Sequence, residues 1–164
     1  MDIDQLKLLP LLESDVPDLA EIMERAFEED ARIHLEENDL GSQGYDLYFL
    51  KRWGLSEEAT SYKIVYKDKM IGGVLLWLQE KKHTHFLGNL FLDVNYQNQG
   101  IGTQVWNMIE AMYPDTISWS TETPGYARRD HYFYVSKCGF HITRIDNPKD
   151  SYGSTYILEK NMAL

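Results

Sequence analysis

The sequence predicts a single domain of the mixed α+β class, with a central mixed, mostly antiparallel twisted sheet flanked by helices. First, 164 residues with 43% hydrophobic and 13% aromatic side chains are enough to bury one core. Second, three apolar runs between residues 62 and 94 predict strands joined by short turns. Third, residues 90–121 read as a strand, a glycine turn, a helix and another strand. This order predicts a parallel β–α–β unit at the centre of the sheet.

The N-terminal part of the chain predicts one strand and one amphipathic helix. Residues 5–9 form the short strand, and Ser14 or Asp15 caps the helix, with Pro17 in its first turn. Residues 30–42 are polar and predict a loop or a frayed helix end. The helix between them carries an apolar stripe that we expect to be buried: Val16, Leu19, Ala20, Met23 and Phe27.

A second helix is predicted over residues 44–54, followed by an antiparallel meander. One face of this helix is aromatic, and we expect these residues to pack in the core: Tyr45, Tyr48, Phe49 and Trp53. The meander consists of three predicted strands, at residues 62–66, 70–79 and 84–94.

The remaining elements follow the central helix. Residues 116–121 predict a strand that Pro124 and Gly125 end. A helix follows over residues 126–140, with Gly139 as its C-terminal cap. Two further strands are predicted at residues 141–145 and 155–159.

Histidine and cysteine usage gives little support for a metal site or a disulfide framework. His83 and His85 lie two apart, but no nearby acid or cysteine completes a ligand set, so we expect no metal. Cys138 is the only cysteine and precedes a capping glycine, so we expect it in the core and not as a nucleophile. The N-terminus lacks a signal pattern, and a cytoplasmic location is the simplest expectation.

The formal charge of −10 is concentrated in one segment. Eleven acidic residues lie between Glu13 and Asp39, against only Arg25 and Arg32. A chain this acidic is a poor nucleic-acid binder, and no apolar run approaches the length of a membrane span. The acidic block is either a solvated helix face or an attractor for a cationic substrate.

The turn between the central strand and helix predicts an anion-binding cradle. Gly100 and Gly102 open the helix, whose first N–H groups lack internal partners and lie at the positive end of its dipole. A dinucleotide fingerprint would need a third glycine where Val105 stands, and a phosphate-binding P-loop would need a lysine after Gly102. The pattern that remains is Gln97-x-x-Gly100-x-Gly102 directly after a strand.

This pattern resembles the [QR]-x-x-G-x-[GA] motif of the GNAT superfamily, the acyl-CoA-dependent N-acyltransferases. A second stretch, FYVSKCGF at residues 133–140, is similar to the close of the fourth GNAT helix. The resemblance covers essentially the whole chain and implies one GNAT-like domain over residues 1–164. Three parts are implied: helices bordering the acceptor site (1–60), central strands with the CoA cradle (62–112), and the half with the general acid (116–164).

The resemblance also implies acetyl-CoA as co-substrate and a set of residues that bind it. The strand before the cradle should splay from its neighbour near Trp119, and the pantetheine arm should pair in the gap like an added strand. The backbone of Leu92 and Val94 should contact the acyl group and this arm. The motif residue Gln97 begins the cradle, and the pyrophosphate should meet the N–H groups around Gln99, Gly100, Gly102 and Thr103.

Tyr134 occupies the position of the usual general acid of the superfamily. A phenol is protonated at neutral pH and can give its proton to a leaving thiolate; the alternative is a tyrosine packed in the core. The general base is left open between Asp93, Glu122 and His131. We favour Glu122, because it lies at the carboxyl end of a central strand.

The chain departs from the family pattern at two places. Ala127 stands where many members have an asparagine that contacts CoA. Arg128 or Arg129 is either a substitute contact to the phosphates or a solvated pair. Gln97 and Gln99 stand where the cradle often has basic residues, so binding should rely on backbone amides.

The resemblance implies an N-acetyltransferase that moves an acetyl group from acetyl-CoA to a primary amine of a small molecule or peptide by direct attack. The acidic block favours a cationic acceptor, such as a polyamine or an aminoglycoside. The alternative is a non-catalytic acetyl-CoA sensor on the same fold. A protein that has lost CoA binding is disfavoured by the intact glycine turn. A homodimer is common in the family, although no pattern here specifies an interface.

Overall fold

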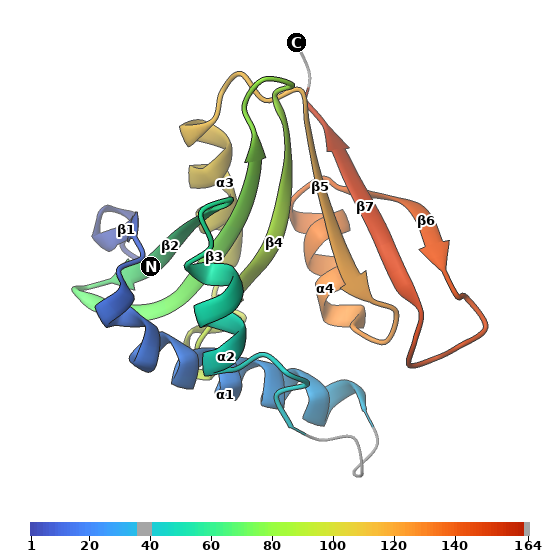
Figure 1. Cartoon of the computed structure of the whole chain (residues 1–164), viewed down its shortest axis with the longest axis horizontal. Coiled ribbons are helices and arrows are strands. Elements are labelled where there is room, and N and C mark those ends of the chain that lie inside the picture. The colour runs from blue at the N-terminus through green and yellow to red at the C-terminus, as the bar shows by residue number, and fades with distance from the viewer. Residues whose placement is uncertain (36–40, 163–164) are drawn as a thin grey trace.

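A seven-stranded sheet forms the centre of the protein, as a computed structural model shows for residues 1–35 and 41–162 (Figure 1). The strand order is β1-β2-β3-β4-β5-β7-β6, and β4 and β5 are the one parallel pair; the other neighbours are antiparallel. This confirms the predicted mixed class. The strands are β1 (Leu6–Pro10), β2 (Ala59–Tyr66), β3 (Lys69–Gln79), β4 (Thr84–Leu92), β5 (Ser118–Pro124), β6 (His141–Asp146) and β7 (Thr155–Asn161).

Helices cover both faces of the sheet. The longer ones are α1 (Val16–His34) and α3 (Ile101–Met112), and short 3₁₀ turns precede α1 and follow β4. Two further helices each continue from an α-helical turn into a π-helical turn: α2 (Leu47–Phe49) with η4 (Leu50–Gly54), and α4 (Arg128–Tyr132) with η6 (Phe133–Lys137). Among the described residues, no helix combines the length and apolar character needed to cross a membrane.

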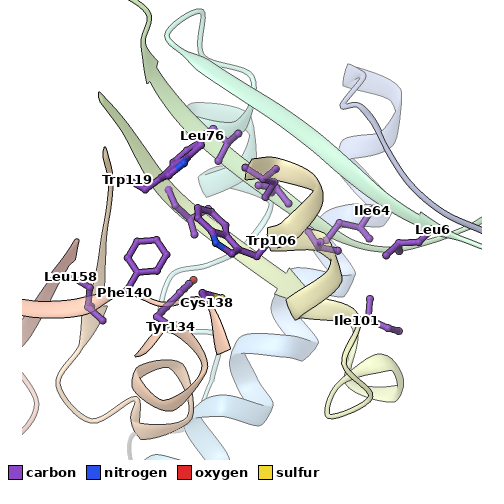
Figure 2. Packing of buried hydrophobic residues seen from close by; sticks show 14 of the residues in the cluster. Leu6, Ile64, Leu76, Ile101, Trp106, Trp119, Tyr134, Cys138, Phe140 and Leu158 are labelled. Atoms are coloured by element: carbon purple, nitrogen blue, oxygen red, sulfur yellow. The ribbon is translucent and has the colours of Figure 1, made fainter. Parts of the chain in front are cut away.

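Alternation along β3 divides the buried side chains between two cores. Val74 and Leu76 face a cluster with Trp106 of α3, whereas Leu75 between them belongs to the cluster of α1 and α2. Figure 2 shows part of the first cluster, in which Trp106 and Trp119 meet edge to face at 5.1 Å. Because each helix pair buries its apolar stripe on its own side, α1 and α2 lie on one face, and α3 and α4 on the other.

The N-terminal helices differ from the expectation in the aromatic stripe of the second one. Helix α1 continues to His34, so of the loop and the frayed helix expected from residue 30 the helix is present as far as His34; residues 36–40 of that expected segment lie outside the described residues. The aromatic stripe of the second helix is only partly buried. Tyr45 stacks on Phe27 at 4.0 Å, but Tyr48 and Trp53 are exposed, because the short helix turns this edge to solvent.

The parallel strands β4 and β5 separate part of the way along. They pair from Thr84 and Ser118 to Leu87 and Thr121, and beyond that point the two strands diverge (Figure 1). Trp119 lies in the paired part and Thr121 is the last residue of β5 that pairs, so the strands separate near Trp119, as the sequence predicted.

A bulge in β4 marks the same point. Asn89 pairs with Leu75 of β3 and Leu87 pairs with Leu76, which leaves Gly88 as an extra residue. The ring of Trp77 covers Gly88 so closely that a Cβ would not fit. The bulge bends β4 away from β5 and leaves two open strand edges that form a wedge.

Candidate active site

The wedge opens into a cleft of about 880 Å³ that connects both sides of the sheet. Residues of β4 line its middle: Leu90, Phe91 and Leu92. The turn before α3 and the start of that helix line one end, with Gln97, Asn98, Gly100, Gly102, Thr103 and Gln104. Helix α4 with η6 contributes Arg128, Arg129, Asp130, Tyr132, Phe133 and Lys137, and α1 contributes Ala26, Phe27 and Asp30.

The start of α3 has the geometry of an anion site. Gly100 caps the helix with φ of +82°, a left-handed conformation that glycine adopts without strain. The helical hydrogen bonds begin with the N–H of Gln104, which donates to the Gly100 carbonyl at 3.2 Å. The N–H groups of Ile101, Gly102 and Thr103 therefore precede the ladder and point out of the helix end.

Gln97 and Gln99 were both expected in the cradle, but their side chains make different contacts in the structure. The side-chain amide of Gln97 donates to the Leu92 carbonyl at 2.9 Å, and its oxygen accepts a hydrogen bond from Arg129 at 3.0 Å. Gln97 therefore joins the end of β4 to α4. Gln99 is exposed, bonds the Asn95 carbonyl at 2.8 Å and does not line the cleft.

Val94 is the second expected binding residue outside the cleft. Its N–H donates to the carboxylate of Asp93 at 2.9 Å and so is already occupied. The same carboxylate accepts two hydrogen bonds from Arg25, at 3.1 and 2.9 Å. This side-chain bond with Arg25 holds the pKa of Asp93 below its usual range, so Asp93 is a paired anion and a poor base.

The cleft suits a phosphorylated ligand with a peptide-like arm. Besides the helix N-terminus, three cationic side chains line it: Arg128, Arg129 and Lys137. Two strand edges are open, and the hydroxyl of Thr123 in the diverging part of β5 is buried without a partner among the described residues. The cationic side chains and the free N–H groups can pair with phosphates, and Lys137 is a cation that the sequence analysis did not single out.

Tyr134 lies where β4 and β5 separate. Its hydroxyl has the hydroxyl of Thr121 as its hydrogen-bonding neighbour, and Thr121 is the last residue of β5 that pairs with β4. Figure 2 shows Tyr134 beside Cys138 and Phe140, below the tryptophans of the first core. Burial raises the pKa of Tyr134 well above its usual value, so the phenol keeps its proton at neutral pH.

The helix that carries Tyr134 widens at that residue. Residues 133–137 form a π-helical turn, in which the N–H of Cys138 donates to the Phe133 carbonyl at 3.1 Å. Gly139 ends the helix with φ of +86°, as the sequence predicted. Cys138 is buried, as predicted, and burial raises its pKa to about 12, so the thiol is not a nucleophile.

The other two candidate bases, Glu122 and His131, lie on β5 and α4. Glu122 follows Thr121 on β5, so its side chain points to the opposite face of the sheet, the face of α1 and α2. It is exposed. His131 has its Nε2 atom 3.0 Å from the Pro124 carbonyl, and its ring stacks on Tyr156 at 4.2 Å.

Of the two histidines of the meander, His85 has a structural role. His85 accepts a hydrogen bond from the N–H of Gln79 at 3.1 Å and packs on Trp119. His83 lies in the preceding turn. Among the described residues, no group of three potential metal ligands occurs.

Sequence reading missed one group at the α1 end of the cleft: Asp30, Tyr45, Tyr126 and Asp130. Burial and the charge of Asp30 raise the pKa of Asp130 to about 7. Burial also raises the pKa of Asp30 and, together with the neighbouring acids, raises that of Tyr126 to about 12. Asp30 lies on α1 and Asp130 on α4, whereas Tyr45 precedes α2 and Tyr126 lies in the turn before α4, so no local pattern could reveal the group.

The fold and the cleft define a class of acyltransferase, and comparison with known proteins identifies the family. A model of the acetyltransferase (GNAT) family matches residues 17–140, well over half of the chain. The protein belongs to this family.

Solved structures show the same fold. An acetyltransferase from Thermus thermophilus superposes with a TM-score of 0.75 at 15% identity, covering 96% of this chain and 97% of that one. PaiA N-acetyltransferase from Thermoplasma acidophilum, solved in complex with coenzyme A, also reaches 0.75, at 17% identity and 96% and 99% coverage. Among curated proteins, uncharacterized YrkN from Bacillus subtilis (strain 168) is 39% identical over 93 residues. That match spans 57% of this chain but only half of YrkN.

Proposed function

We propose that the protein is an acetyl-CoA-dependent N-acetyltransferase that acetylates a primary amine of a small molecule or peptide by direct attack. The observation that carries the proposal is the position of the protonated Tyr134 hydroxyl. It lies beside Thr121, where the β4–β5 wedge begins, and the same wedge opens toward the anion site of α3. The proton donor thus lies next to the point where the two strands separate, and the phosphate cradle lines the cleft beyond that point.

Each group in the cleft has a defined task in this proposal. The N–H groups at the start of α3, with Arg128 and Lys137, hold the phosphates. The open edge of β4 around Leu92 binds the arm as an added strand would. Bound acetyl-CoA supplies an activated thioester.

Proton transfers are divided between the two faces of the sheet. Tyr134 holds a proton on its phenol oxygen for the leaving thiolate. Glu122 lies on the opposite face and accepts the proton of the attacking amine, directly or through water. Because the acid and the base lie on opposite sides of β5, the amine gives its proton to one side chain and the thiolate receives a proton from another.

An amine panel tests the proposal. The protein is incubated with acetyl-CoA and single amines, and both thiol release and the acetylated amine are measured. Amine-dependent release with a matching acetylated product supports the enzyme. Binding of acetyl-CoA without transfer to any amine would contradict it and favour a sensor. A cytoplasmic location stays an expectation from the sequence.

A further inference from the structure

The acidic residues of α1 separate into two groups in the structure. Glu28 and Glu29 line a different hollow, on the side of Asp93. Glu29 is also paired with Arg32, with hydrogen bonds of 2.6 and 2.9 Å. Asp30 is the acid of α1 that lines the cleft. The attraction of a cationic substrate that was expected from the whole acidic block is therefore assigned to one carboxylate at the cleft, that of Asp30.

Asp130 meets Asp30 from the other side of the cleft. It lies on α4 one turn before Tyr134, so the two side chains share a helix face. Among the described residues, no hydrogen bond or ion pair reaches the Asp130 carboxylate, and the charge of Asp30 is felt at Asp130. Two carboxylates thus face one space, and one of them has no partner.

His34 lies beside Asp30 and is a second buried polar side chain without a hydrogen bond among the described residues. Its side chain is only 4% exposed, yet neither ring nitrogen has a hydrogen bond among the described residues. Its Nε2 atom lies 3.5 Å from Asp30. Burial lowers the pKa of His34, so the ring is neutral at neutral pH and does not compensate Asp30.

The other neighbours do not neutralise the pair either. Arg129 is engaged by Gln97, and its charge only partly offsets the burial of Asp130. Tyr45 and Tyr126 face the two acids as neutral phenols, because burial, and after it the charges of the acids, raise their pKa values. The ring of Phe27, which lines the cleft and stacks on Tyr45, offers an apolar wall next to the carboxylates. Carboxylates beside aromatic faces suit an alkyl ammonium ion.

We propose that Asp30 and Asp130 form a subsite for a second ammonium group of the acceptor, one that does not react, so that the acceptor is a diamine or a longer polyamine. That the bound diamine is also an acetyl acceptor rests on the proposed function. The binding of an ammonium group by Asp30 and Asp130 does not. The methylene chain lies along Phe27, and the cationic end meets the two carboxylates.

Equilibrium binding tests the subsite without requiring turnover. Calorimetry compares 1,4-diaminobutane with n-butylamine on the protein saturated with CoA, at about pH 8, where both amines are cationic. The variants are Asp30→Asn and Asp130→Asn, which keep the side-chain shape. The control is Glu28→Gln, which removes an exposed acid of the same helix outside the cleft. Thermal melts establish that each variant is folded.

The expected result is a preference for the diamine of about tenfold or more in the wild type, lost in each Asp variant. Butylamine affinity should fall less than diamine affinity in the Asp variants, because its single ammonium group can also occupy the reactive position, and Glu28→Gln should keep the diamine preference. Equal affinity for the two amines in the wild type, or an unchanged preference in both Asp variants, would overturn the subsite. If CoA does not bind, the proposed function fails, and the same comparison on the free protein still decides the subsite.

Discussion

Arg129 of α4 donates a 3.0 Å hydrogen bond to the side-chain oxygen of Gln97, whose amide nitrogen donates to the carbonyl of Leu92 at 2.9 Å. One glutamine therefore ties α4 to the end of β4 across the open side of the wedge. Beyond Leu87 and Thr121, β4 and β5 are not paired with each other through their backbones. The width of the gap thus depends on side-chain contacts of this kind.

Replacing Gln97 should loosen the wedge. In Gln97→Ala both hydrogen bonds are lost, and we expect acetyl-CoA affinity to fall about fivefold, with a stability loss of about 1 kcal/mol. Gln99→Ala is the matched control, because Gln99 lies in the same turn but outside the cleft. Calorimetry and thermal melts measure both. Equal effects of the two variants would show that Gln97 has no special role.

Tyr134→Phe should remove the proton donor and leave the fold intact. We expect kcat to fall by about 10²-fold or more, with the affinity for acetyl-CoA changed by less than about threefold. Tyr48→Phe is the control, since Tyr48 is exposed and does not line the cleft. Steady-state kinetics with the best amine of the panel gives the answer. A kcat within threefold of wild type for Tyr134→Phe would exclude Tyr134 as the acid.

The choice of base is tested by comparing Glu122→Gln with Asp93→Asn. Loss of Glu122 should lower kcat by about 10²-fold, because the amine then keeps its proton. Loss of the Asp93 charge should lower Tm and leave kcat within about threefold, since Asp93 is paired with Arg25. The reverse result, with activity depending on Asp93, would reassign the base.

Asp130 should make the stability of the free protein fall as pH rises. Its pKa is about 7 in the folded protein against an ordinary 3.8. Between these values the folded state binds more protons than the unfolded state, so rising pH costs stability. Asp130→Asn should therefore raise Tm at about pH 8 by a few degrees, about 1 to 2 kcal/mol, and give no gain at about pH 4.

Asp30 and Arg129 act on Asp130, and Asp130 in turn acts on Tyr45, Tyr126 and Tyr134. All five groups remain in the Asp130→Asn variant, so the comparison removes one carboxyl group. Thermal melts across this pH range are sufficient. A gain in Tm that is the same at both pH values would show that Asp130 is not held with a raised pKa.

Local patterns in the sequence predicted more of the fold than of the site. The strand, glycine turn and helix around Gly100 were found because each is encoded by neighbouring residues. The exposure of Tyr48 and Trp53 was missed, because periodicity identifies a helix face and not what covers it. The start of the wedge near Trp119 was predicted, but the bulge at Gly88 under Trp77 that accompanies it was not, because a bulge depends on pairing with another strand.

The predicted binding residues divide in the same way. Leu92, Gln97, Gly100, Gly102 and Thr103 line the cleft, whereas Val94 and Gln99 do not. Gln97 and Gln99 look equivalent in the motif, and only their tertiary contacts distinguish them. Asp30 and Asp130 lie far apart in the chain and meet only because α1 and α4 approach the wedge from opposite sides.

Titration of acetyl-CoA into the protein tests the cradle most directly, with NADH as the ligand control. Gly100→Ala and Gly44→Ala are matched, because both glycines have similar positive φ and open space around the Cβ position. Both should lose about 1 kcal/mol of stability. The predicted result is a Kd of about 10 μM for acetyl-CoA, weakened severalfold by Gly100→Ala alone, and no binding of NADH. No binding of acetyl-CoA to the wild type would contradict the function proposed for the cleft.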